Sequence, residues 1–209
     1  MKMRFLYLIM ALALGSAATF AAEEVRDPTK AEIAIVMELN TARQTPRAYA
    51  EYLRAFRRQI KDGDIVRGNV RIRTKEGVAA IDEAIAFLEK QRPMPPLSIS
   101  RGLTLAARVH AEEQAKTGAV GHEGADGSFV ADRVSRFGSW KKVIGENIAY
   151  GFDEPRDVVM QLIIDDGVPD RGHRKNLFNS KYRRIGIANA THPKYRHLSV
   201  HVLAGDFKK

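Results

Sequence analysis

The order of hydrophobic patterns along the chain predicts an α+β fold, in which helices are layered against a small, largely antiparallel sheet. Amphipathic helical patterns come first, and strand-like segments follow near the C-terminus, at residues 184–190 and 197–207. A short apolar segment at 145–151 is typical of a strand end. With 209 residues, the chain has the length of one domain.

Apolar residues that recur every three to four positions predict the helices. In the first, residues 29–43, Thr29 is a candidate N-cap and Ile33, Val36 and Met37 share one face. Pro46 opens the second, at the helical position where its missing N–H costs nothing. Three more helices are expected, at residues 78–88, 103–117 and 158–164. Residues 61–74 are predicted to form a loop or short hairpin, and residues 118–138 a long glycine-rich loop.

The N-terminus has the pattern of a signal peptide. Two positive charges in residues 1–4 precede an apolar run over 5–20, and small residues place cleavage after Ala21. An uncleaved anchor is the alternative, but Glu23 and Glu24 follow the run where a basic stop signal is expected. We therefore expect a signal peptide at 1–21 and a single soluble domain at 22–209, secreted or periplasmic. Without Lys2 and Arg4, that domain carries 32 − 25 = +7.

The charge and the cysteine count limit the partners. The chain has a net charge of +9, but its Lys and Arg residues are scattered and no nucleic-acid recognition motif accompanies them. We expect no nucleic-acid partner, and an anionic envelope surface suits the charge better. The absence of cysteine excludes disulfides and a lipid-modified N-terminal cysteine.

Familiar catalytic motifs are absent: HExxH, GxSxG, a phosphate-binding Gly-Lys-Ser loop and a cysteine nucleophile. Ionisable residues instead gather in three glycine-containing segments. His122 enters a glycine-rich loop, where it either binds metal or titrates, or simply bonds to backbone. Glu146 lies in an apolar segment, where a buried carboxylate needs a partner, and this favours a functional role over a structural ion pair.

The third segment contains two acids and a histidine. Asp165 and Asp166 both follow the apolar stripe of the 158–164 helix. Either one faces a cleft while the other caps the turn at Gly167, or both are solvated turn acids. His173 lies in a stretch predicted as a turn that enters a strand, and is weak evidence by itself.

Four further side chains are weighed as lesser candidates. His110 falls on the apolar stripe of its helix and is expected to be packed or hydrogen-bonded there. His197 and His201 share the less apolar face of the last strand, and a ligand role for His201 is not favoured. Ser128 lies in an open loop, where it is expected to shape a turn rather than act as a nucleophile.

These segments resemble the signature blocks of one family. GHEGADGS at 121–128, GENIAYG at 145–151 and IDDGVPDRGHRKN at 164–176 are similar, in order and spacing, to the blocks of the CAP superfamily, also called SCP or PR-1-like. The likeness extends over about residues 30–207, and the lack of cysteine is typical of bacterial members. It implies a three-layer α-β-α sandwich with a central cleft, with residues 61–95 inserted as a loop and an extra helix between the first two core helices.

The resemblance also implies a His–Glu–acid–His set in the cleft, with zinc or another divalent metal at the histidines. Carried over by motif, the metal-binding histidines are His122 and His173 and the first acid is Glu146. The second acid departs from animal members, which place a glutamate on the helix after the GEN block. Here that stretch offers only Asp165 and Asp166.

Three functions follow from these observations. The first is an exported binding module whose cleft holds a divalent ion, a small or lipidic ligand or an extracellular partner. The second is a hydrolase, in which metal-bound water or Glu146 as general base attacks a peptide or ester. In the third, the cleft is structural and the basic surface binds an envelope polymer or anionic lipid.

Overall fold

The computed structural model describes residues 27–67 and 70–209. The predicted signal peptide, residues 1–21, lies outside these ranges and stays a prediction. Within the described ranges, no helix is both long and apolar enough to cross a bilayer.

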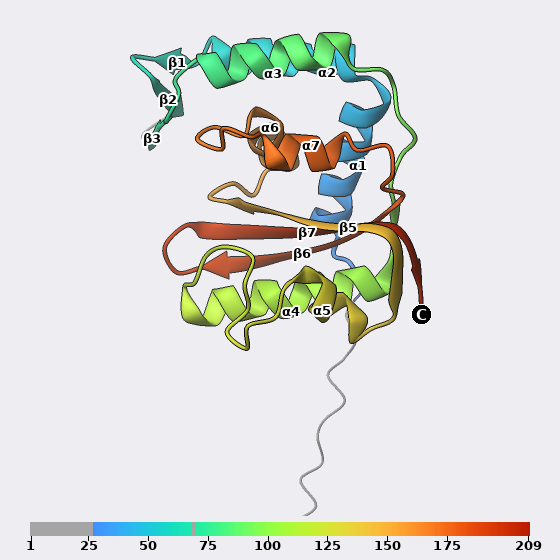
Figure 1. The fold of residues 1–209 in the computed structure, drawn as a ribbon. Helices are drawn as coiled ribbons and strands as arrows, with labels where there is room; N and C mark the ends of the chain where they lie inside the picture. Colours follow the sequence, from blue (N-terminus) through green and yellow to red (C-terminus); the bar gives the residue numbers. More distant parts are fainter. Residues whose placement is uncertain (1–26, 68–69) are drawn as a thin grey trace, which may run out of the picture.

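A four-stranded sheet forms the centre of the molecule (Figure 1). Its strand order is β4-β6-β7-β5, so β5 lies at one edge. The β4–β6 pair is parallel, and the β6–β7 and β7–β5 pairs are antiparallel, which confirms the largely antiparallel sheet. The strands span Ser98–Ile99 (β4), Ser139–Tyr150 (β5), Arg184–His192 (β6) and Arg196–Lys208 (β7).

Helices cover both faces of this sheet, so the α-β-α sandwich is confirmed (Figure 1). Two helices lie against one face, and three lie on the other, with α1 running from the sheet to the far end of that side. The first two are α4 (Arg101–Thr117) and α5 (Val130–Ser135), and the other three are α1 (Lys30–Gln44), α6 (Pro155–Ile164) and α7 (Gly172–Leu177).

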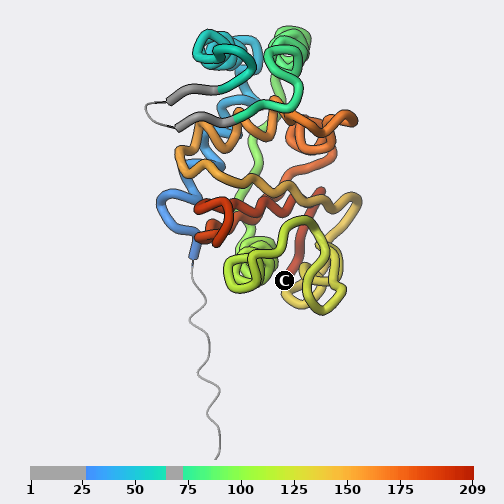
Figure 2. Tube along the Cα trace, turned by 90° about the vertical axis from the view of Figure 1, so that its left-hand side faces the viewer, coloured from blue at the N-terminus to red at the C-terminus, as the bar shows by residue number. Residues whose placement is uncertain are grey.

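The segment expected as an insertion adds a further layer. Its helix α3 (Ala79–Lys90) lies beside α2 (Pro46–Arg57), and the two appear end-on above α6 and α7 in Figure 2. Before α3, the segment predicted as a loop or short hairpin forms antiparallel hairpin pairs in a small three-stranded sheet: β1 (Ile60–Lys61), β2 (Asp64–Arg67) and β3 (Val70–Arg73).

Two apolar cores flank the sheet because side chains alternate along each strand. On β7, Leu198, Val200 and Val202 pack with α4 in one core. Leu203 points to the other face and joins the larger core with α1, α3 and α6. The polar side chains of Ser199 and His201 share the face of Leu203 and are buried there. The sheet therefore separates the two cores.

The start of α1 is as predicted, but of the three residues predicted to share its apolar face only Val36 is buried. Thr29 caps the helix in a capping box with Glu32. The predicted inward residues Ile33 and Met37 are 38% and 65% exposed. A buried glutamate is the reason: Glu32 accepts a hydrogen bond from the Asn189 backbone N–H at 2.8 Å, which turns the face of Glu32 and Ile35 toward the sheet. Apolar spacing alone does not reveal a core position held by a carboxylate.

Three other predictions need correction. The predicted 118–138 loop contains helix α5. His173 lies in helix α7, and not in a turn that enters a strand; Gly172 and the following charged residues concealed this short helix. Strand β5 begins at Ser139 and not near Gly145, because Lys141, Lys142 and a β-bulge between Lys141 and Ile144 interrupt the apolar alternation in its first half.

Helix α4 approaches the sheet most closely at Gly186 of β6. A methyl group there would lie 2.0 Å from the Leu103 carbonyl carbon and 2.2 Å from the Thr104 nitrogen. Both contacts are with backbone, so a larger residue must displace the whole helix.

We therefore predict that Gly186→Ala lowers the free energy of unfolding by about 1–3 kcal/mol or more through overpacking. Thr191→Ala, at an exposed position of the same strand, is the control. Urea denaturation compares the two variants, and equal stability would contradict the close packing of α4 on β6.

Candidate histidine site on the edge strand

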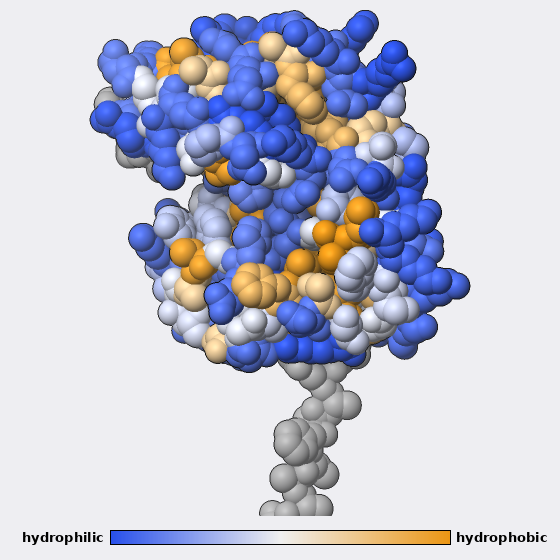
Figure 3. All heavy atoms as spheres, in the orientation of Figure 1, coloured by the Kyte–Doolittle hydropathy of each residue, from blue (hydrophilic) through white to orange (hydrophobic). Residues whose placement is uncertain are grey.

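The structure brings His122 and His173 together from segments about fifty residues apart in the sequence. Their ring centres are 6.5 Å apart, and the ring planes are inclined by 40°. His122 lies in the loop before α5, on one side of the sheet, and His173 lies in the first turn of α7, on the other. Edge strand β5 runs between these segments, on a face that is indented between the upper and lower layers (Figure 3).

Two neighbouring residues of β5 connect these segments. Successive side chains of a strand point to opposite faces of a sheet, so Glu146 and Asn147 reach in opposite directions. Glu146 Oε1 is 2.9 Å from His122 Nδ1. The Asn147 side-chain amide donates to the His173 carbonyl at 3.0 Å. The GEN motif therefore holds both histidine segments through one dipeptide.

The carboxylate of Glu146 is buried, with 1% of its side chain exposed, and Arg133 balances its charge. Arg133 Nη2 donates to both oxygens, at 2.8 and 3.0 Å. The same guanidinium donates to the Ser128 and His122 carbonyls at 2.6 and 3.1 Å, so it also fixes the histidine loop. Sequence reasoning missed Arg133 because it lies in a stretch predicted as a loop.

Asp165, and not Asp166, lies against the second histidine. Asp165 Oδ1 is 2.6 Å from His173 Nδ1, and Oδ2 accepts the His173 backbone N–H at 2.9 Å. Asp165 ends α6 in the left-handed conformation, at φ 59°, which turns its carboxylate to the start of α7. Asp166 instead accepts the Lys75 and Glu76 backbone N–H groups at 2.7 and 2.8 Å. Asp166 therefore connects the turn after α6 to the 61–95 segment.

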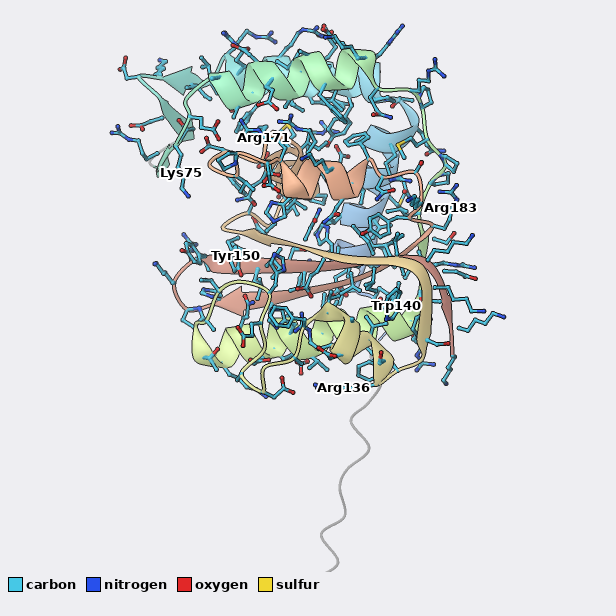
Figure 4. All side chains as sticks on the ribbon, viewed as in Figure 1. Lys75, Arg136, Trp140, Tyr150, Arg171 and Arg183 are labelled. Atoms are coloured by element: carbon cyan, nitrogen blue, oxygen red, sulfur yellow. The ribbon has the colours of Figure 1, made fainter. Side chains whose placement is uncertain are left out.

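Two arginines at the start of α7 form ion pairs with glutamates of the 61–95 segment. Arg171 donates to Glu76 at 2.7 Å and to Glu83 at 2.7 and 2.9 Å. Arg174 is buried and donates to Glu83 at 2.7 Å. The hydrogen bonds from Arg171 lower the pKa of Glu76 to about 2, so this carboxylate is charged throughout the neutral range. Helix α3 thus supports the start of α7, the helix that carries His173; Figure 4 labels Arg171, one of the two arginines involved.

The His122 loop is held at Gly121. The Gly121 carbonyl accepts from Gln114 Nε2 at 2.7 Å, and His110 Nε2 lies 2.8 Å from the same oxygen. The Gly121 backbone N–H donates to the Tyr150 hydroxyl at 3.1 Å. The prediction of a packed, hydrogen-bonded His110 is confirmed, and its partner Gln114 lies one helical turn further on.

His201 is fully buried on the sheet face that carries α7, and its Nε2 is 2.9 Å from the Ser199 hydroxyl. Burial, with a smaller contribution from the positive potential of His173, lowers the pKa of His201 to about 3. His197 lies near the surface, 3.6 Å from Asp153. Ser128 accepts a turn hydrogen bond from Gly124 at its carbonyl, as expected of a turn residue.

The hydrogen bonds of the two histidines define what their free nitrogens can do. With a carboxylate at each Nδ1, the neutral ring carries its proton there and leaves Nε2 with a lone pair. A carboxylate behind an imidazole is the usual support of a metal-binding histidine. About 47% of the His122 side chain and 23% of the His173 side chain are exposed, so both rings are accessible.

The spacing sets a condition on metal binding. Two imidazoles that bind one tetrahedral zinc ion through Nε2 have ring centres about 5 Å apart. The observed separation of 6.5 Å would require the ring centres to approach each other by about 1.5 Å. The described residues contain no cluster of three His, Asp or Glu side chains placed to hold a metal ion. His122 and His173 would therefore offer an ion two nitrogen ligands at most, and water would have to complete its coordination.

Comparison with known proteins identifies the family of this chain. The family model described as CAP, the cysteine-rich secretory protein family, matches residues 38–207. The chain belongs to the CAP family.

Individual relatives are more distant. The uncharacterized protein YkwD of Bacillus subtilis (strain 168) is 29% identical over 114 residues, which are 53% of this chain and 42% of YkwD. The chain thus spans less than half of that relative. Two solved structures are similar, and each match covers 53% of this chain. One is an outer surface protein of Borrelia burgdorferi, with 18% identity, a TM-score of 0.46 and 78% of that chain covered. The other is an extracellular SCP-domain protein of Bacillus anthracis str. Ames, with 19% identity, a TM-score of 0.44 and 34% of that chain covered.

Loss of Arg133 should leave the Glu146 carboxylate buried without its balancing charge. We predict that Arg133→Met lowers the free energy of unfolding by about 3–5 kcal/mol, as for other broken buried pairs. Arg136→Met is the matched control, because Arg136 pairs at the surface with Asp126 at 2.7 Å and such pairs contribute about 0–1 kcal/mol. Urea denaturation measures the free energy of unfolding of both variants. An equal decrease in the two would contradict a larger contribution from the buried pair than from the surface pair.

His201 should make the fold sensitive to acid. Because its folded pKa of about 3 lies below the ordinary value of 6.5, its stabilisation is complete above pH 6.5 and is lost as the pH falls toward 3. We predict that His201→Gln flattens the decline of stability between pH 7 and pH 4, measured by urea denaturation. His197→Gln, on the same strand but partly exposed, should decline as the wild type does; a similar decline in His201→Gln would contradict the burial of a neutral ring.

Proposed function

We propose that this CAP domain is an exported binding protein whose histidine site holds a divalent transition-metal ion through Nε2 of His122 and His173. The observation that supports the proposal is that each Nδ1 lies against a buried carboxylate, at 2.9 Å in one pair and 2.6 Å in the other. Each carboxylate fixes the ring and increases the basicity of the opposite nitrogen. Zinc is the probe of choice because it accepts imidazole and water together.

Export is part of the proposal. The apolar run at residues 5–20, after two basic residues, has the pattern of a signal peptide. The family to which the chain belongs is described as one of secretory proteins. Both observations favour a location outside the cytoplasm.

Binding is favoured over hydrolysis by the surroundings of Glu146. Its carboxylate accepts hydrogen bonds from Arg133 at 2.8 and 3.0 Å and faces His122 Nδ1 at 2.9 Å. A general base needs a free lone pair directed at the proton that it removes. With its oxygens already engaged, Glu146 is better placed to orient His122 than to activate water.

Zinc should therefore raise the melting temperature, because a ligand that binds only the folded state stabilises it. We predict that His122→Ala combined with His173→Ala abolishes this rise, while His197→Ala, which removes a histidine outside the site, retains it. Differential scanning fluorimetry at increasing zinc measures the effect.

Asp165→Asn should weaken the zinc affinity, measured by calorimetry, by about 10–100-fold, the usual effect of losing a carboxylate behind a metal ligand.

Two results would overturn the proposal: a melting temperature unchanged at saturating zinc, or an equal rise in the double-histidine variant. Circular dichroism of each variant separates loss of binding from loss of folding.

A further inference from the structure

A second site lies at the opposite end of β5 from Tyr150, where Figure 4 labels Arg183 and Trp140. Two surface hollows, of about 400 and 430 Å³, meet there. Both are lined by Lys142 and Arg183, so they form one open groove. The histidines of the candidate metal site line neither hollow. We call this feature the basic groove, lined by Pro96, Ser98, Lys142, Val143, Ser180, Lys181, Arg183, Arg184, Gly205 and Asp206.

The charge of the basic groove is one-sided. Four cations line it against one acid, Asp206, whose carboxylate lies 3.8 Å from Arg184. Among the residues that the structure describes, no carboxylate lies within ion-pair distance of Lys142, Lys181 or Arg183. All three are exposed. Burial, with a smaller contribution from the charge of Arg183, lowers the pKa of Arg43 to about 10.

The backbone is shaped to bring these cations together. A β-bulge between Lys141 and Ile144 interrupts the β5–β7 pairing, and Lys142 within it has the left-handed φ of 71° that side chains rarely adopt. Bulges of this kind redirect a side chain. Gly205 on β7 admits the close approach: a Cβ there would lie 2.9 Å from the Lys141 carbonyl oxygen and 3.2 Å from that of Lys181.

The shape and the polarity of the basic groove indicate the kind of ligand. Sites for small apolar ligands are enclosed and mostly hydrophobic. Here the two hollows share Lys142 and Arg183, are open to solvent and are lined mainly by charged and polar residues. Lysine ammonium and arginine guanidinium groups along one groove match anionic groups spaced along a chain, and arginine forms paired hydrogen bonds to phosphate.

We propose that the basic groove binds a linear polymer that carries phosphate groups, independently of the histidine site. Lys142 and Arg183 contact the polymer in both hollows, and Lys181 and Arg184 each contact it in one. Attraction at exposed cations is screened by salt, so binding should be strong at low ionic strength and weaken steeply as salt is added.

The test is calorimetric titration of the full chain with linear inorganic polyphosphate at several salt concentrations. We expect binding in the wild type, and loss of it in Lys142→Glu combined with Arg183→Glu. Lys142→Gln with Arg183→Gln should weaken binding and reduce the slope of log affinity against log salt by roughly one for each lost contact. Circular dichroism and the melting temperature confirm that each variant is folded.

Charge-matched and ligand controls decide between local and general attraction. Lys30→Glu with Lys116→Glu changes the net charge equally at exposed positions outside the groove, and should retain most of the affinity. An equal loss in this control, or unchanged binding in the groove variants, overturns the proposal. So does tighter binding to a carboxylate polymer such as polygalacturonate or to vesicles rich in phosphatidylglycerol. An unchanged zinc response in the groove variants would show that the two sites are independent.

Discussion

The ion pair between Glu146 and Arg133 is the interaction on which the histidine site depends. Both side chains are 1% exposed, and a buried carboxylate is tolerated only with a partner of this kind. Because Arg133 also donates to the His122 carbonyl, one guanidinium fixes the loop, the carboxylate and the first histidine. On the next residue of the same strand, Asn147 holds the segment of the second histidine. An edge strand can do this because both of its faces lie near helical layers while its outer edge remains open.

The second histidine depends on a different part of the chain. Asp165 orients His173, and the loop that carries Asp165 is fastened to the insertion through Asp166, Arg171 and Arg174. Helix α3 is therefore more than an outer layer over α2. The 61–95 segment supplies Glu76 and Glu83, whose charges compensate the two arginines at the start of α7. The two imidazole rings therefore face each other across β5, and each is held by its own carboxylate. A substitution can thus remove the carboxylate of one ring and leave that of the other in place.

The sequence predicted the family, the layered fold, the two histidines and the first acid, because each lies in a motif block or in a strong hydrophobic period. It left open the choice between Asp165 and Asp166, since that choice rests on the left-handed turn at Asp165, which spacing does not encode. Arg133 and the inward face of α1 were missed for a common reason: buried charged residues, here Arg133 and Glu32, appear as surface residues in a hydrophobicity pattern. The sequence pattern did not reveal the basic groove, because its lining comes from four separate segments that the folded chain brings together, with a bulge and a close glycine contact among them.

The most direct test of the central claim is a long-range ¹H–¹⁵N spectrum of the histidine rings, recorded above neutral pH during a zinc titration. We expect His122 and His173 both to carry their proton on Nδ1, with the carboxylates of Glu146 and Asp165 as partners. We also expect the two Nε2 resonances to shift together and to saturate at one zinc ion per chain. A ring protonated on Nε2 instead, or a zinc response confined to one histidine, would contradict the single two-histidine site.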